Sequence, residues 1–447
     1  MRLDEQDREI FRLAVPAFFA LVAEPLYVLT DTAIVGHLGT AQLGGLSAAS
    51  AVLLSGYSIF VFLAYGTTAA VARLLGAGRH ERAAEEAVQS LWLAVIAGVA
   101  VAVIAGLLSE PLIHLFSHDA AVRHYGLRYL RISLLGVPAM LIMLAGVGYL
   151  RGLQDTRRPL IVAVATAGLN LVLEVVLIYG LHQGVGASAA ATVVAQWVGT
   201  VVYLRWIIVA VRGHGVGIKP DPRRIGALAR VGVHLVIRTI ALRGSFVLAA
   251  AAAARIGTVP LAAHEVAFQV LALLALVLDA IAIAGQAIVG RLLGAGQALA
   301  ARAAAYRMTA WAALVGVAAA LVLLATRTAL PHLFSNDPAV RALTAFLLLH
   351  TALMQPMNGA VFALDGILIG AGDQRFLAWA MVGSAAVFVP AVVIVRATDA
   401  GIGWLWFAME IFMLARLVPL AARLRTNRWA VVGATVPPTR NLARNRH

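Results

Sequence analysis

Long apolar stretches alternate with short polar ones along the whole chain. A helix that spans a bilayer needs about 20 mostly apolar residues, and twelve stretches reach that length. The pattern therefore predicts an all-α integral membrane protein with twelve transmembrane helices. The helices are expected at 10–34, 44–70, 86–108, 128–150, 159–180, 187–209, 229–253, 260–288, 306–325, 343–370, 376–396 and 402–422.

The first six predicted helices and the last six are copies of one another. LIHLFSHDAAVR at 112–123 returns as LPHLFSNDPAVR at 330–341, identical at nine of twelve positions, and RLLGAG at 73–78 returns at 291–296. Both pairs are separated by 218 residues, which indicates a duplication. Because each copy holds an even number of helices, the repeat is parallel and gives two pseudo-symmetric six-helix lobes. Two equal lobes that rock about a central site are a transporter design.

The segment between the copies has the composition of a linker, since it is basic and contains Gly, Pro and the only lysine, Lys219. We therefore divide the chain into four parts. They are an N-terminal lobe at 1–211, a cytoplasmic linker at 212–228, a C-terminal lobe at 229–425 and a basic cytoplasmic tail at 426–447.

Composition excludes several classes of protein. Hydrophobic residues make up 62% of the chain and charged residues 13%, against about 25% charged in soluble domains. A soluble enzyme, a disordered chain and a nucleic-acid-binding module are thereby ruled out. The chain has no cysteine, so thiolate metal sites and Cys nucleophiles are excluded. We find neither a nucleophile elbow nor a phosphate-binding loop, and we expect no enzymatic activity.

The basic residues predict how the chain is oriented in the membrane. With the N-terminus in the cytoplasm, 26 of the 35 Lys and Arg residues fall on the cytoplasmic side and 7 outside. The other two, Arg238 and Arg243, fall inside the seventh helix. This bias follows the positive-inside rule and places both termini in the cytoplasm.

Seven acidic residues lie within or near the apolar segments. A charge at the bilayer centre costs about 2.5–3.5 kcal/mol or more, so these residues are functional candidates. None has an acid at its partner position 218 residues away, so the lobes share a fold but differ in polar chemistry. The seven are Glu24, Asp31, Glu174, Glu265, Asp279, Asp365 and Glu410.

In the N-terminal lobe, Asn170 and Glu174 share a helix face at a spacing of four, and Asp31 and Thr192 lie on other helices. Their hard oxygen ligands suit a proton or a sodium ion rather than a transition metal. An ordinary polar contact between helices is the alternative.

The C-terminal lobe combines Glu265, Asp279, Asp365 and Glu410 with the two arginines of the seventh helix. This set is either a second cation or substrate network, or a group of structural ion pairs. We favour pairing for Arg243. Taken together, the charge inside the membrane is mainly acidic.

Several motifs resemble the multidrug and toxic compound extrusion (MATE) family in its DinF-like branch, and the resemblance covers essentially the whole chain. They are Pro16 followed by EPL at 24–26, DTA at 31–33 and GHLG at 36–39, then RLLGAG, Asn170-x-x-x-Glu174 before LIYG, LDAIAIAGQAIVGRLLGAG at 278–296 and LDGILIGAGD at 364–373. The resemblance places Asp31, Asn170, Glu174 and Thr192 in an N-lobe cation site. It also makes Pro16 the point about which helix 1 bends. Some members carry Asp in place of Glu174, which leaves the choice between H+ and Na+ open.

The resemblance implies a monomeric exporter of the inner (plasma) membrane that works by antiport. Its substrate would be a small amphipathic, often cationic, organic compound, and its coupling ion H+ or Na+, with no cofactor and no nucleic acid. One alternative is a lipid-linked precursor flippase of the same superfamily, which should have a wide cationic cavity. Another is an intramembrane transferase, for which we find no metal-binding acid motif.

Overall fold

The computed structural model describes residues 5–426 and 428–434, which contain helices and no strand. Twelve helical spans are long and apolar enough to cross a membrane. In the first half of the chain, the helices are α1 (Glu5–Gly36), α2 (Thr40–Phe60), α3 (Phe62–Gly76), α4 (His80–Leu107), α5 (Ser109–Phe116), α6 (Ala120–Ser133), η1 (Leu134–Gly136), α7 (Val137–Gly152), α8 (Arg157–Glu174), η2 (Val175–Gly180) and α9 (Val185–Gly213). In the second half, they are α10 (Pro222–Ile256), α11 (Thr258–Gly294), α12 (Ala298–Thr326), η3 (Leu330–Leu333), α13 (Pro338–Gly370), α14 (Gln374–Ala397) and α15 (Ile402–Arg425).

All twelve predicted spans are confirmed, and most of them extend beyond the predicted bounds. The extra turns are polar and helical, so a hydropathy window does not detect them. The segment between α9 and α10 is consequently only 214–221, shorter than the linker predicted at 212–228. The predicted helix 44–70 is divided at Val61 into α2 and α3.

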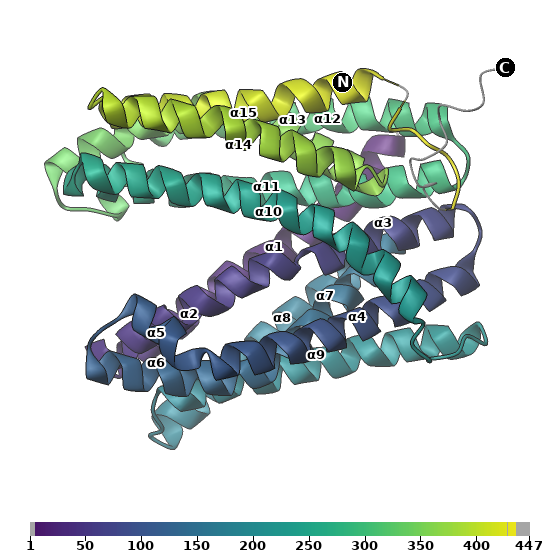
Figure 1. Ribbon diagram of the computed structural model, residues 1–447, viewed down its shortest axis with the longest axis horizontal. Coiled ribbons are helices and arrows are strands. Elements are labelled where there is room, and N and C mark those ends of the chain that lie inside the picture. The colour runs from purple at the N-terminus through teal and green to yellow at the C-terminus, as the bar shows by residue number, and fades with distance from the viewer. Residues whose placement is uncertain (1–4, 427, 435–447) are drawn as a thin grey trace.

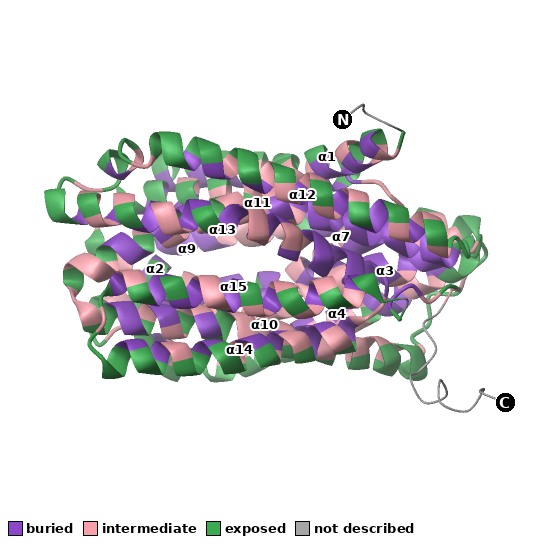
Figure 2. Ribbon diagram, turned by 90° about the horizontal axis from the view of Figure 1, so that it is seen from above, coloured by how far each residue is buried: buried purple, intermediate pink, exposed green. Residues whose placement is uncertain are grey.

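The helices form two groups that diverge toward one end of the molecule and converge at the other (Figure 1). The first group contains α2 to α9, the second group contains α10 to α15, and α1 runs between them. The converging end carries both RLLGAG turns, and we call it the closed end. Buried residues are concentrated around α3 and α7 on this side of the molecule (Figure 2).

Two glycines bring the groups into backbone contact at the closed end. A Cβ atom on Gly76 would collide with the carbonyl oxygen of Arg291, and one on Gly294 would collide with the carbonyl oxygen of Arg73. Each contact is the other shifted by 218 residues, so the duplicated α3 and α11 meet as a pseudo-symmetric pair. Only glycine allows backbones to approach this closely, and the two RLLGAG motifs therefore join the lobes.

The other repeated glycines pack helices within each lobe, as predicted for small-xxx-small pairs. A Cβ on Gly148 of α7 would lie 2.7 Å from the carbonyl oxygen of Ala64 in α3. Its counterpart Gly366 in α13 meets the carbonyl oxygen of Ala282 in α11 in the same way. The duplication thus preserves backbone packing as well as sequence.

Helix α1 contacts both groups. Near its start, Asp7 is fully buried and accepts two 2.6 Å hydrogen bonds from Arg307 and one of 2.7 Å from Trp311, both on α12. Farther along, Ile34 and Val35 pack into apolar clusters of the first group. The first half of α1 is therefore anchored to the second group of helices, and its end to the first.

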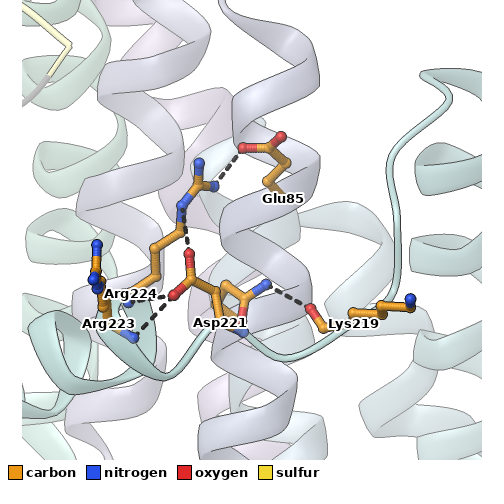
Figure 3. A network of polar contacts seen from close by, with 6 residues as sticks. Glu85, Lys219, Asp221, Arg223 and Arg224 are labelled. Atoms are coloured by element: carbon orange, nitrogen blue, oxygen red, sulfur yellow. Dashed lines mark hydrogen bonds and ion pairs between the residues drawn. The ribbon is translucent and has the colours of Figure 1, made fainter.

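The linker before α10 is bound to the start of α4 (Figure 3). Gln89 donates to the carbonyl oxygen of Lys219 at 3.2 Å and accepts from the backbone N–H of Asp221 at 2.7 Å. Glu85 forms an ion pair with Arg224. Asp221 caps α10 by accepting from the backbone N–H groups of Arg223 and Arg224. These contacts hold the linker to the first group of helices.

We predict that Gly294→Ala destabilises the protein by about 1–3 kcal/mol, the usual cost of overpacking. The matched control is Gly383→Ala in α14, where a Cβ meets no atom within 4 Å and alanine is the better helix former. The measurement is the midpoint of thermal unfolding in one detergent, and equal midpoints for the two variants would contradict the proposed role of the closed-end contact.

Candidate functional site

Asp31 is the centre of a polar cluster inside the first group of helices. Its carboxylate is 5% exposed, accepts a hydrogen bond from the Ser188 hydroxyl, and accepts another from Tyr129 at 3.3 Å. The three residues come from α1, α9 and α6. Both carboxylate oxygens of Asp31 therefore have a hydrogen-bond donor.

A second chain of hydrogen bonds joins the remaining predicted residues. Asn170 of α8 donates to the Thr192 hydroxyl at 3.2 Å, and Thr192 lies 2.7 Å from the Tyr27 hydroxyl of α1. Thr192 in turn donates to the carbonyl oxygen of Ser188 at 3.1 Å. The residues predicted for the N-lobe site therefore do come together, since Ser188 belongs to both chains of bonds.

Glu174 completes the cluster. It is fully buried and interacts electrostatically with Asp31 and Ser188. Within the described part of the chain, neither of its carboxylate oxygens has a hydrogen-bond partner in good geometry. It ends α8, and the next six residues, Val175–Gly180, form a π-helical turn. Such turns are frequent at functional sites. A buried acid with two unpaired oxygens has full capacity to take up a proton or a hard cation.

The cluster can bind one small cation, whose positive charge balances part of the negative charge of Asp31 and Glu174. Two buried carboxylates close together disfavour the doubly ionised state, so a proton or a metal ion is stabilised between them. The oxygens of Asp31, Glu174, Asn170 and Thr192 are the hard ligands that Na+ accepts. The geometry is compatible with either ion.

Sequence reasoning missed three members of this cluster: Ser188, Tyr27 and Tyr129. Two of them carry a detectable signal, because Ser188 lies one helical turn before Thr192 and Tyr27 one turn before Asp31. Residues four apart share a helix face. Tyr129 lies on α6, and nothing in the sequence indicates that α6 meets α1 here.

Two further predicted residues of α1 lie outside the cluster. Pro16 is one of two prolines inside the helix, the other being Pro25, and it lies between the Asp7 anchor and Asp31. Glu24 is exposed, and it interacts with the Tyr57 hydroxyl of α2. Proline removes a backbone hydrogen bond and allows a kink, so α1 has two positions at which it can bend.

In the second group of helices, Asp365 forms ion pairs with two arginines. Its Oδ2 atom lies 2.5 Å from Arg238 and 2.7 Å from Arg416. Asp365 is 6% and Arg416 3% exposed. Removing one partner of a buried pair leaves an uncompensated charge, so this triad fits a structural role.

Asp279 of α11 interacts electrostatically with this triad, whereas Glu410 and Glu265 lie apart from it. Glu410 pairs with His350 at 2.8 Å, and Glu265 is exposed. The pairing predicted for Arg243 is wrong, because its side chain is exposed and forms no ion pair with any residue between 5 and 426 or 428 and 434. Arg416, which lies within the twelfth predicted span, forms a buried ion pair instead.

Arginines lie beside the acids at the centre of the molecule. Arg151, assigned to a loop, is 9% exposed at the end of α7 and interacts electrostatically with Asp279 of α11. With Arg238 and Arg416 nearby, the polar centre of the molecule holds arginines and acids together. Arg151 lies inside because α7 continues to Gly152, beyond the predicted span that ended at 150.

Comparison with known families agrees with this arrangement. The MatE family profile matches residues 16–176 and 235–394, one match in each repeat and together more than half of the chain. The chain belongs to the MatE family. The profile covers Asp31, Asn170 and Glu174 in its first match.

Relatives and solved structures of the MATE family cover nearly the whole chain. Protein DETOXIFICATION 44, chloroplastic, of Arabidopsis thaliana is 31% identical over 441 residues, which are 95% of this chain and 84% of the relative. The DNA damage-inducible protein F of Escherichia coli (strain K12) is 29% identical over 434 residues, 94% of this chain and 92% of the relative.

The fold is that of solved MATE structures. Structures of a MATE in bent and straight conformations have TM-scores of 0.86 and 0.85 at 21% identity, each covering 96% of both chains. A multidrug resistance MATE transporter of the MOP superfamily, solved in an outward-facing conformation, has a TM-score of 0.84 at 21% identity over 96% of both chains. The protein is therefore a multi-pass membrane transporter of the MATE family, with the two-lobe architecture of these structures.

We predict that Asp365→Asn destabilises this MATE protein by about 3–5 kcal/mol, because it leaves two buried guanidinium groups without a counter-charge. The control is Glu265→Gln, which neutralises an exposed acid and should change stability by less than about 0.5 kcal/mol. Thermal unfolding in detergent measures both. An Asp365→Asn variant as stable as the control would show that the triad is not structural.

Proposed function

We propose that the protein exports small amphipathic, often cationic, organic compounds by antiport with H+ or Na+. The observation that carries this proposal is the position of Asp31. It is a buried acid beside a second buried acid, Glu174, and it lies on α1, the helix that contacts both groups of helices.

Ion binding changes the charge of the cluster, and this in turn shifts the position of α1. A monovalent cation that enters from outside removes one negative charge from the Asp31–Glu174 pair, and Ser188 and Tyr129, which donate to Asp31, then face a less charged acceptor. The end of α1 can then shift while its start stays anchored through Asp7. Pro16 lies between these two points, where a bend would reshape the space between the lobes and release the substrate.

The closed end is proposed to face the cytoplasm. It carries the turn after α3, the turn after α11 and the linker 214–221, next to which lie Arg79, Arg212 and Arg224. The positive-inside rule places such residues in the cytoplasm. The structure then corresponds to an outward-facing state in the inner (plasma) membrane, with both termini cytoplasmic.

The domain division follows from the same packing. We propose lobes at 1–211 and 229–425, with α1 as the element that couples them. The tail assigned to 426–447 is described only at Thr426 and at 428–434. One chain supplies both lobes, so a monomer suffices for alternating access.

The flippase alternative receives no support from the arginines found inside the second group. Arg238 and Arg416 share one carboxylate oxygen of Asp365, and Asp279 interacts electrostatically with both. Their charge is therefore largely balanced by acids. A wide cationic cavity for a phosphorylated lipid would need guanidinium groups without such partners.

We predict that Asp31→Asn abolishes coupled efflux but leaves membrane insertion intact. The change removes the negative charge and keeps the shape of the side chain, so the cation loses its ligand. Uptake of a cationic dye into everted vesicles, which corresponds to export from the cell, is the measurement, and Glu265→Gln is the control because Glu265 is an exposed acid outside the cluster. Full efflux by Asp31→Asn would contradict the proposal.

The coupling ion is tested in proteoliposomes with a pH gradient and a sodium gradient imposed separately. We expect one of the two gradients to drive uptake of the dye against its own gradient in the wild-type protein and neither to do so in Asp31→Asn. Transport that responds to neither gradient in the wild-type protein would exclude cation coupling.

A further inference from the structure

The two arginines of the duplicated RLLGAG motif are held by opposite ends of the chain. Arg291 in α11 donates to Glu9 of α1 at 2.7 Å. Arg73 in α3, its partner in the repeat, donates instead to backbone carbonyl oxygens of the C-terminal segment: Val431 at 3.0 Å and Gly433 at 3.0 Å. The duplication thus created two equivalent arginines at the closed end, and different parts of the chain now bind them.

The segment 428–434, which we call the C-terminal strap, crosses from one lobe to the other. At its start, Trp429 is 1% exposed, donates to the carbonyl oxygen of Leu424 at 2.9 Å and packs in the core of the second group of helices. At its end, Ala434 packs against a core cluster of the first group. Between them, the backbone N–H of Gly433 donates to the carbonyl oxygen of Leu293 in α11 at 3.0 Å.

Arg73 is the point at which the strap meets both lobes. It is 2% exposed and, among the described residues, its hydrogen bonds go to carbonyl oxygens and it forms no ion pair with an acid. The third acceptor, Ala371 at 2.6 Å, belongs to the second lobe. A buried guanidinium without an acid depends on such acceptors, and the strap supplies two of the three.

The strap therefore connects the same two helices that the glycines bring into contact. The Gly76 and Gly294 contacts bring α3 and α11 together, and Arg73 and Leu293, which bind the strap, lie within the same two helical turns. Separation of α3 from α11 would pull Arg73 away from Val431 and Gly433, or Gly433 away from Leu293. The closed end cannot open while all of these bonds remain.

We propose that the C-terminal strap is a lock that holds the closed end shut, and that it must release Arg73 before the lobes can separate there. The lock is a feature of the fold and does not depend on which ion or substrate the protein carries. Its loss should raise the ratio of open to closed molecules at this end about tenfold or more, because two hydrogen bonds to a charged group disappear.

The test uses the absence of native cysteines. Spin labels are attached to Arg79→Cys and Gln297→Cys, exposed positions that follow the two RLLGAG motifs and are related by the repeat. Their distance distribution is measured by double electron–electron resonance in three proteins: the full chain, a chain lacking 435–447, which keeps the strap, and a chain lacking 428–447, which does not.

The chain lacking 435–447 should match the full chain, and the chain lacking 428–447 should show a new population at longer distance. Identical distributions in all three proteins would overturn the lock. If the shorter chain does not fold, Gly433→Pro decides, because proline removes the N–H that binds Leu293 and cannot adopt the φ of 118° found there. The longer population should then appear, and its absence would overturn the proposal.

Discussion

Backbone contact between α3 and α11 is the constraint on which the arrangement of this transporter depends. Gly76 and Gly294 bring each helix against a carbonyl oxygen of the other, which fixes the lobes at one end and leaves the other end free to diverge. Such contact has no tolerance for a side chain, so it is either made or broken. An interface of this kind favours two discrete states over a continuous series, and alternating access requires two states.

Helix α1 links that interface to the polar cluster around Asp31. Its start is tied to α12 through Asp7. Glu9 accepts hydrogen bonds from Arg291 of the second lobe and from Gln154 of the first lobe. Its far half carries Asp31. A change of charge at Asp31 is therefore applied to a helix whose other end lies beside the closed contact. In the proposed mechanism, this anchored helix connects the two places without a long relay of side chains.

The sequence alone was sufficient for the twelve spans, the parallel repeat and the group of Asp31, Asn170, Glu174 and Thr192, because these follow from hydropathy, from the 218-residue period and from family motifs. It was insufficient for Arg151, since a window average ends a helix where a charged residue begins, and for the pairing of Arg416, since Asp365 lies on another helix. Ser188 and Tyr129 reach Asp31 through contacts between helices far apart in sequence. Neither the π-helical turn after Glu174 nor the strap has a hydropathy signature.

The proposed antiport requires that substrate binding expels the coupling cation from the cluster around Asp31, and ion release on substrate binding measures this step. A cationic dye that the wild-type protein exports is added to purified protein in weakly buffered solution, and H+ and Na+ are followed with selective electrodes. We expect the wild-type protein to release one of these ions. Asp31→Asn should release neither when the same fraction of its molecules has bound dye. Equal release from both proteins, or no release of either ion from the wild-type protein, would contradict the proposed antiport.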